Sequence, residues 1–273
     1  MMAELFSLRG RVAVVTGGLG LLGRQFARGL AEAGARVAIL DLPCTPERIA
    51  AAYGAEADAA HFLFLTADVT RRASLEEALA AIRQHWETPH ILVNNAALDS
   101  PPHSPPEENG PFETYPEASW DKVLEVNLKG VFLCSQVFGG AMAEAGRGSI
   151  INISSIYGLV SPDQSLYTYR QEKEGAPFFK PVAYSASKSG LLNLTRYLAT
   201  YWAGRGVRVN TLTLAGVFNR QDERFLAGYT RKVPLGRMAR EDEYRGAVVF
   251  LSGEASSYMT GSNLIMDGGW TAW

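Results

Sequence analysis

The sequence predicts a doubly wound α/β fold in which helices cover both faces of a seven-stranded parallel sheet. Short apolar runs rich in β-branched residues alternate along the chain with longer helical patterns. The runs are continuously apolar, which indicates strands that are buried on both faces. The alternation then implies parallel strands joined by right-handed crossovers. The expected strands are residues 11–16, 36–40, 62–66, 91–95, 149–154, 207–213 and 263–267.

The helices expected between these strands lie near 20–33, 71–87, 117–145, 182–204 and 241–252. No repeat or linker divides the chain, so residues 1–273 are predicted to form a single domain. The net charge of −2 gives no general attraction to nucleic acid or to an anionic membrane. Two cysteines, Cys44 and Cys134, are typical of a reducing compartment. Without a signal-like or membrane-spanning apolar run, the expected location is the cytoplasm.

Two stretches, about 98–118 and 159–181, interrupt the alternation and are expected to be irregular loops. The first carries six prolines, and the second is polar and aromatic. Both follow strand carboxyl ends, where open α/β sheets bind ligands. Their hydrogen-bonding and aromatic groups favour a polyol, a sugar or a sugar phosphate as substrate. These groups are His103, Tyr167, Tyr169, Arg170, Gln171, Lys173 and Lys180.

The first strand runs into a glycine-rich turn and then an amphipathic helix, in the sequence VVTGGLGLLG. Gly18, Gly20 and Gly23 give G-x-G-x-x-G, whereas Gly17 in place of Gly18 gives G-x-x-G-x-x-G. A third pattern, TG-x-x-x-G-x-G, would need a glycine in place of Leu21. Each arrangement lets the backbone approach a pyrophosphate at the N-terminus of a helix. The turn therefore predicts a dinucleotide site of Rossmann type.

Acidic and amide side chains follow the next strands. Asp41 lies eighteen residues after Gly23, where a carboxylate holds the adenosine ribose hydroxyls. That carboxylate would repel the 2′-phosphate of NADP, and the residues after it, Leu42 and Pro43, include no arginine. NAD is therefore the expected cofactor. Asp68 and Asn94 end the third and fourth strands and are expected to contact adenine and brace the strands.

The stretch YSASK, residues 184–188, opens an apolar helix and carries the chemistry. Tyr184 and Lys188 are four residues apart and share one helix face. A tyrosine with a pKa of about 10 is a poor base at neutral pH. The Lys188 ammonium and a positively charged nicotinamide are expected to lower that pKa. Lys188 is also expected to hold the nicotinamide ribose. Ser155 at a strand end can hydrogen-bond the substrate. Asn127, inside a helix that bends there, can hold a water linking Lys188 to solvent.

Together these motifs resemble the short-chain dehydrogenase/reductase family over essentially the whole chain. The motifs are TGGLGLLG, Asp68, NNAA, Asn127, Ser155, YSASK, VRVN at 207–210 and MTGSNLIMDGG at 259–269. The resemblance implies that Tyr184 is the acid/base and that Ser155 orients the substrate. Lys188 would tune Tyr184, and Asn127 would maintain a proton relay, while hydride passes between the substrate carbon and nicotinamide C4. The cofactor-binding residues expected are Gly17, Gly20, Leu22, Gly23, Asp41, Asp68, Val69, Asn94, Ala96, Tyr184, Lys188 and Val217, with no metal.

The family also implies a homotetramer, or a homodimer, with helices 117–145 and 182–204 at one interface. Trp270 and Trp273 in the tail GGWTAW are expected to pack against a neighbouring subunit, because exposing them is costly.

The sequence departs from the family pattern at four places. Leu21 and Ala97 replace glycines, and Leu214 and Ala215 stand where Pro-Gly is usual. Ser155 and Tyr184 are also unusually far apart in the sequence. The insertion between them is expected to bulge outward and to reshape the substrate mouth. The glycine spacing and the insertions resemble a subgroup associated with flagellin-glycan and nonulosonic-acid pathways.

Two other functions are compatible with parts of the pattern. An extended-type nucleotide-sugar epimerase or dehydratase uses the G-x-x-G-x-x-G spacing, but the chain ends directly after MDGGW, without a large substrate region. A redox-inactive NAD-binding sensor or scaffold would have no need to keep all four of the expected catalytic residues, Asn127, Ser155, Tyr184 and Lys188.

Overall fold

Seven parallel strands form one sheet in the order β3-β2-β1-β4-β5-β6-β7. The structure is a computed structural model that describes residues 2–58, 60–99 and 106–273. The strand order reverses between β1 and β4, which creates a crevice at their carboxyl ends. The doubly wound parallel sheet predicted from the sequence is confirmed. The strands are β1 Val12–Thr16, β2 Arg36–Asp41, β3 Phe62–Thr66, β4 Ile91–Asn94, β5 Gly148–Ser155, β6 Val207–Leu214 and β7 Asn263–Met266.

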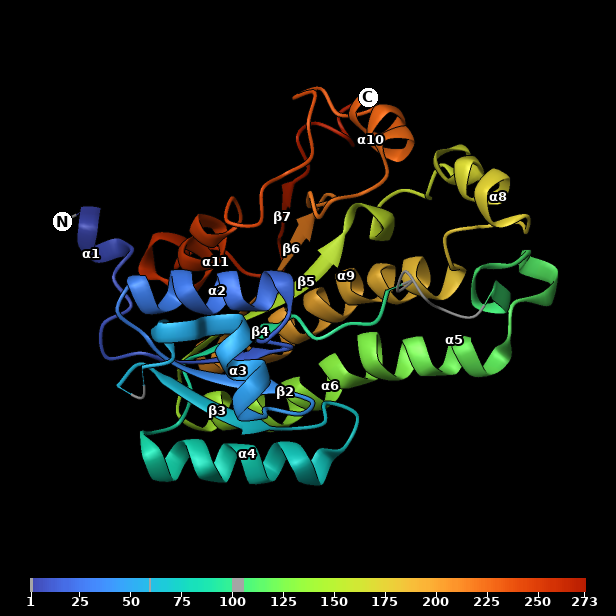
Figure 1. The fold of residues 1–273 in the computed structure, drawn as a ribbon. Helices are drawn as coiled ribbons and strands as arrows, with labels where there is room; N and C mark the ends of the chain where they lie inside the picture. The colour runs from blue at the N-terminus through green and yellow to red at the C-terminus, as the bar shows by residue number, and fades with distance from the viewer. Residues whose placement is uncertain (1, 59, 100–105) are drawn as a thin grey trace.

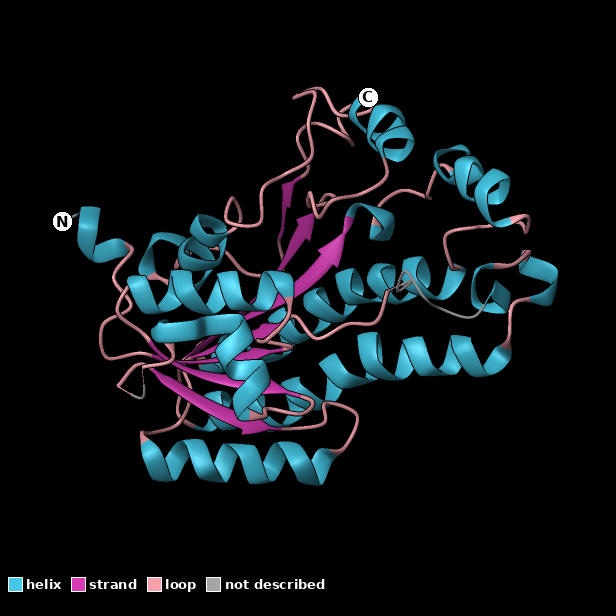
Figure 2. Cartoon of the chain, viewed as in Figure 1, coloured by secondary structure: helices cyan, strands magenta, loops and turns pink. Residues whose placement is uncertain are grey.

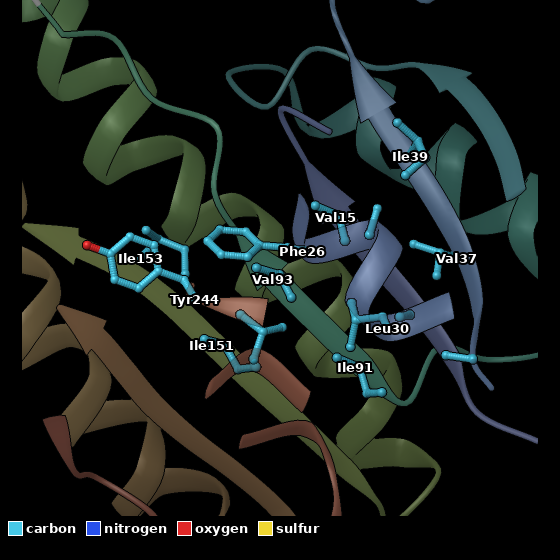
Figure 3. Close-up of a cluster of buried hydrophobic side chains, with 14 of the residues drawn as sticks. Val15, Phe26, Leu30, Val37, Ile39, Ile91, Val93, Ile151, Ile153 and Tyr244 are labelled. Carbon is cyan, nitrogen blue, oxygen red and sulfur yellow. The ribbon is translucent and has the colours of Figure 1, made fainter. Parts of the chain in front are cut away.

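Alternate residues of the strands are buried in two different clusters, one on each face of the sheet. On one face Val15, Ile39 and Val93 pack with Phe26 and Leu30 of α2 (Figure 3). This face is covered by α2 Leu21–Glu32, α3 Pro46–Tyr53 and α11 Arg245–Ser252. The opposite face is covered by α4 Arg72–His85, the helical stretch 117–144 and α9 Val182–Trp202 (Figure 1). Burial on both faces explains why the strands read as continuous apolar runs.

The long helical stretch is not uniform. It consists of α5 Glu117–Leu124, α6 Gly130–Cys134 and α7 Gly140–Glu144, joined by π-helical turns at Glu125–Lys129 and Ser135–Gly139. A π turn shifts the direction of the side chains that follow it and is frequent at functional sites. Asn127 lies in the first of these turns.

The sequence predicted that the segment 159–181 is an irregular loop that bulges outward. The structure differs from this prediction. The segment contains a 3₁₀ turn at Gln164–Tyr167 and the helix α8 Thr168–Glu174. Leu166, Tyr167 and Phe178 are buried in a third cluster with Tyr229 and Trp270. Because Tyr229 belongs to α10 Glu223–Thr230, the segment is packed beyond the strand ends against α10 and the C-terminal tail (Figure 2).

In the other segment, residues 106–118 contain 3₁₀ turns at Pro106–Asn109 and Phe112–Thr114, and α5 then begins at Glu117. Pro101, Pro102, His103 and Pro105 lie outside the described residues. The remaining helical elements are α1 Met2–Leu5 and 3₁₀ turns at Gly54–Glu56, Ile156–Gly158, Ala203–Arg205 and Glu254–Ser256. In the part of the chain that the structure describes, no helix has the length and apolarity needed to span a bilayer.

Candidate active site

A cleft of about 970 Å³ runs along the carboxyl ends of the strands, from the glycine turn to the start of α9. Most of the residues expected at the site line it. These are Gly17, Gly20, Leu22, Gly23, Asp41, Asp68, Val69, Ala96, Ser155, Tyr184, Lys188 and Val217. Asn94 and Asn127 do not line the cleft, and their side chains act elsewhere.

The glycine turn resolves the two spacings in the sequence. Gly17 has a φ of +62°, and a Cβ there would lie 2.9 Å from the Cα of Ala96. A Cβ at Gly23 would lie 2.1 Å from the carbonyl oxygen of Gly17. By contrast, a Cβ at Gly18 would meet Ile39 of β2 at 2.6 Å, so this glycine serves packing of the sheet. The G-x-x-G-x-x-G pattern therefore describes the turn that borders the cleft.

The N-terminus of α2 has the features of an anion site. Its N-cap residue is Gly20, which offers no side-chain cap, and its first turn has no acidic residue. The first backbone N–H groups of a helix have no partner within the helix. Here they belong to Leu21, Leu22 and Gly23, all of which line the cleft. This arrangement fits a pyrophosphate.

Asp41 accepts hydrogen bonds on both carboxylate oxygens. Oδ2 accepts from the Leu19 amide at 2.9 Å, and Oδ1 accepts from the Leu42 amide at 2.8 Å and from Nη2 of Arg48 at 3.1 Å. Arg48 also lines the cleft. Sequence reasoning missed this arginine because it missed α3. The signal was Thr45-Pro46, since Thr45 caps α3 and proline occupies its first turn.

The strand-end residues Asp68 and Asn94 differ in their roles. Asp68 lines the cleft and accepts from the amide of Thr70 at 2.9 Å. Asn94 is buried, and its Nδ2 donates to Oδ1 of Asn152 at 2.8 Å, so it braces β4 against β5. Asn94 thus lies outside the lining of the cleft in which adenine was expected to bind, and its side chain makes the expected bracing contact. The neighbouring Asn95 lines the cleft and supports the glycine turn, donating to the carbonyl of Gly17 at 3.1 Å.

Ser155, Tyr184 and Lys188 meet on one wall of the cleft. Ser155 ends β5, and its Oγ accepts from the amide of Tyr157 at 3.2 Å. Tyr184 lies in the first turn of α9, and Ser155 hydrogen-bonds its side chain. One helical turn later, the buried Lys188 donates from Nζ to the carbonyl of Ile153 at 2.8 Å, with Nζ 5.8 Å from the centre of the Tyr184 ring.

Asn127 is fully buried beside this wall. Its Oδ1 accepts from the Leu98 amide at 2.7 Å, and its Nδ2 donates to the Leu98 carbonyl at 2.9 Å and to Oγ of Ser187 at 3.1 Å. The side chain therefore clamps the backbone after β4 to the helix that carries Tyr184 and Lys188. The π turn is what directs a residue in the middle of a helix toward these partners.

Burial dominates the acid–base properties of the site. It raises the pKa of Tyr184 above its usual value, as does the Asp99 carboxylate, while the hydrogen bond with Ser155 opposes the change. Burial also lowers the pKa of Lys188 to about 8, against the effect of Asp99. The expected lowering of the Tyr184 pKa is therefore not produced by the groups of the protein itself, because burial and the Asp99 carboxylate disfavour the phenolate more than the Ser155 hydroxyl favours it.

Both segments that interrupt the alternation contribute to the cleft above Tyr184. Nζ of Lys180 lies 4.8 Å from the centre of the Tyr184 ring and forms an ion pair with Asp99. The backbone amide of Phe179 donates to the carbonyl of Asn109 at 2.7 Å, which joins the two segments. Tyr167, Tyr169 and Arg170 line the cleft, as expected from the sequence, whereas Gln171 and Lys173 do not. Asp99 was not singled out in the sequence.

The loop after β6 adds the residues that stand in place of Pro-Gly. Leu214, Ala215 and Val217 line the cleft, and Val217 forms a parallel bridge with Ala239. In this bridge Ala239 bonds the amide of Phe218 and the carbonyl of Gly216, so the Val217 amide points to the other side. Among the described residues, no cluster of three or more His, Cys, Asp or Glu side chains is placed to hold a metal ion.

Comparison with known proteins gives a family match, two related sequences and one related structure. Residues 20–271 match the model of a family described as enoyl-(acyl carrier protein) reductase. The chain is 35% identical to D-threitol dehydrogenase of Mycolicibacterium smegmatis, over 97% of this chain and 95% of that protein. It is 31% identical to NAD-dependent glycerol dehydrogenase of Listeria innocua, over 97% and 96%. A gluconate 5-dehydrogenase from Burkholderia cenocepacia, solved with NADP and tartrate, superposes over 100% of both chains with a TM-score of 0.85 and 28% identity.

Proposed function

Since the chain belongs to the short-chain dehydrogenase/reductase family, we propose that it interconverts a secondary alcohol and a ketone on a polyol or sugar-like substrate, with a nicotinamide dinucleotide as cofactor. The observation that carries this proposal is the shared cleft. It has the Gly17–Gly23 turn at one end and Ser155, Tyr184 and Lys188 at the other. The names of the relatives, which act on threitol and glycerol, support the class of substrate.

We further propose that NAD is preferred over NADP. A 2′-phosphate would approach the Asp41 carboxylate, and Coulomb repulsion opposes it. Arg48 reduces this repulsion, but its guanidinium is already engaged by Asp41 and by the Pro43 carbonyl, the latter at 2.6 Å. The measurement is kcat/KM for NAD and NADP with the same alcohol. We expect a ratio of at least 10 in favour of NAD, and equal values would contradict the proposal.

In the proposed oxidation the alcohol loses one hydrogen as a hydride from its carbinol carbon and one as a proton from its hydroxyl. A nicotinamide dinucleotide held by the Gly17–Gly23 turn and Asp41 would supply the hydride acceptor for oxidation of the carbinol carbon and the hydride donor for reduction. The Ser155 hydroxyl orients the substrate oxygen, and Tyr184 takes the hydroxyl proton during oxidation or gives it during reduction. The products of oxidation are thus a ketone, the reduced cofactor and one proton released to solvent. Neutral Tyr184, favoured by its raised pKa, is the form required for reduction.

Lys188 and Asn127 support the tyrosine. The Lys188 ammonium, held by the Ile153 carbonyl, stabilises the phenolate that forms when Tyr184 gives up its proton, and we propose that Lys188 also holds the nicotinamide ribose. Asn127 fixes Leu98 and Ser187 next to this lysine. We propose that it maintains the proton relay between Lys188 and solvent.

The decisive experiment mixes the protein with NAD and a panel of alditols and follows NADH absorbance. Tyr184→Phe removes the group that transfers the proton but keeps the ring. We expect kcat to fall at least 100-fold, a typical effect of losing a general acid–base, with NADH binding unchanged. Turnover at the wild-type rate in Tyr184→Phe would refute the mechanism.

We propose that the enzyme is a cytoplasmic homotetramer or homodimer. Cys44 and Cys134 are both free thiols, which supports a reducing compartment. The exposed aromatic side chains of α6 and α9, which are Phe132, Tyr197 and Tyr201, support association.

A further inference from the structure

The charges of the cleft are unbalanced at its substrate end. Among the described residues that line the cleft outside its adenosine end, four are cations and two are carboxylates. They are Arg170, Lys180, Lys188 and Arg220, and Asp99 and Asp222. Lys188 is occupied by the Ile153 carbonyl, and Asp222 caps α10 by accepting from the Arg224 amide. The excess positive charge favours an anionic ligand over a neutral one.

The Lys180 ammonium lies nearer to the centre of the Tyr184 ring than that of Lys188, at 4.8 Å against 5.8 Å, and its backbone position is built into the fold. Its backbone amide donates to Oε1 of Gln164 at 2.9 Å, and its carbonyl accepts from Nε2 of the same side chain at 3.5 Å. Pro181 follows and is the N-cap residue of α9, which carries Tyr184. The backbone of Lys180 is therefore fixed beside the start of α9, within side-chain reach of the Tyr184 ring.

The two members of the Lys180–Asp99 pair differ in exposure. The Lys180 side chain is only 10% exposed, whereas that of Asp99 is 53% exposed. The Asp99 carboxylate is therefore the partner that solvent reaches more readily, whereas an unpaired Lys180 would be left as a mostly buried charge without a counter-ion. Whatever replaces Asp99 at Lys180 must supply a negative charge.

We propose that Lys180 anchors a carboxylate of the substrate, which takes the place of Asp99, so that polyhydroxy acids are preferred over the neutral polyols of the same carbon chain. This inference rests on the proposed function, because it places the carboxylate beside the alcohol that Tyr184 deprotonates. The anchor lies 4.8 Å from the centre of the Tyr184 ring, so the carboxylate and the reacting carbon belong to one short carbon chain.

Other residues that line the cleft suit the rest of such a molecule. The hydroxyls of Tyr157 and Tyr167 lie 3.3 Å apart, and both residues line the cleft. The guanidinium carbon of Arg170 is stacked 3.8 Å from the centre of the Phe178 ring. These groups present donors and acceptors to several hydroxyls.

The test compares aldonates of four to six carbons with the alditols of the same configuration. Binding to the NADH complex is measured by calorimetry, and turnover with NAD by absorbance. We expect wild type to bind and oxidise at least one aldonate 30-fold or more better than its matched alditol. Lys180→Met should remove this advantage by weakening aldonate binding about 30-fold or more, the usual effect of deleting one partner of a buried charge pair. Its affinity for alditols and for NADH should change less than threefold.

Two further variants control the experiment. Lys232→Met removes a positive charge from the same part of the molecule, but Lys232 pairs with Asp163 outside the cleft and should leave both affinities unchanged. Lys180→Arg keeps the charge and should retain most of the preference for aldonates.

The outcomes separate the inference from the proposed function. If alditols are oxidised as well as aldonates, or if Lys180→Met weakens both classes equally, the pair only joins the two segments and the anchor is refuted. If no alcohol is oxidised but aldonate binding depends on Lys180, the anchor stands and the proposed function fails.

Discussion

His90 is a buried residue that makes the stability of the fold depend on pH. Its Nδ1 accepts from the Val12 amide at 3.0 Å, so this nitrogen carries no proton in the folded protein. Burial lowers the pKa of His90 to about 4, with nearby Arg147 adding to the effect and Glu87 opposing it. In the unfolded chain the pKa is about 6.5. The unfolded state therefore binds the proton first, and stability falls as the pH drops from about 6.5 to about 4.

We predict that this histidine contributes about 2 kcal/mol to the loss of unfolding free energy between pH 7 and pH 5. His90→Asn keeps an oxygen that can accept from Val12 and has no titration there, so its unfolding free energy should vary less with pH by that amount. Urea unfolding at the two pH values measures the difference. His85→Asn, at the exposed end of α4, is the matched control and should follow wild type. Equal pH dependence of His90→Asn and wild type would contradict the prediction.

The glycine turn gives a second prediction for a single residue. Gly23→Ala would place a Cβ 2.1 Å from the Gly17 carbonyl oxygen, and the turn must open to relieve the overlap. We expect NADH affinity to fall at least tenfold, measured by fluorescence titration. Gly246→Ala is the control, because Gly246 lies in α11 with nothing within 4 Å of the added Cβ. It should stabilise the protein by up to about 1 kcal/mol. Unchanged NADH binding in Gly23→Ala would show that the turn does not hold the cofactor.

Residues were predictable where local geometry decides their position. Asp41 and Asp68 follow strands whose carboxyl ends meet at one edge, and the spacing of Tyr184 and Lys188 puts them on one helix face. Asn94 was wrongly assigned to the cleft instead of the adjacent Asn95. Successive side chains of a strand point to opposite sides, so which asparagine faces the cleft depends on where β4 ends, and the sequence does not fix that residue. The Lys180–Asp99 pair joins residues far apart in the sequence, and no local pattern brings them together.

At the scale of elements, the strands and long helices follow their apolar periodicity, but the short helices do not. In α8, the sequence TYRQEKE is polar on all sides, so it has no amphipathic pattern to detect. It is held by its neighbours, since Tyr167 and Phe178 on either side are buried with α10 and Trp270. Such a helix depends on tertiary packing rather than on its own propensity.

This cluster corrects the expectation for the C-terminal tail. Trp270 is buried within its own chain, with its ring centre 4.6 Å from that of Tyr229, whereas Trp273 is 81% exposed. We predict that Trp270→Ala lowers the unfolding free energy by about 3 kcal/mol, as expected for a large buried aromatic. It should also raise KM for the alcohol, because the cluster borders the substrate end of the cleft. Trp273→Ala should leave monomer stability unchanged, and a loss of equal size in both variants would contradict this account.

For the whole molecule, exposed aromatic side chains lie on α6 and α9, which belong to the two helical stretches expected from the sequence at an interface. Phe132 is 44% exposed, Tyr197 is 63% exposed and Tyr201 is 60% exposed. The two tyrosine rings are stacked with their centres 6.0 Å apart. Leu128, Phe132 and Leu194 line a hollow beside them. Aromatic groups of this kind are enriched in the buried centres of protein interfaces.

We therefore predict that the protein associates through this surface, which we expect a second copy to cover by two-fold symmetry. Light scattering should give the mass of a dimer or tetramer. Phe132→Glu places a charge at the centre of the contact and should shift the mass toward that of the monomer, because each of two symmetry-related carboxylates would be desolvated. Tyr258→Glu, at a fully exposed tyrosine outside α6 and α9, should leave the mass unchanged. A monomeric wild type, or a Phe132→Glu variant that keeps the full oligomer mass, would exclude this interface.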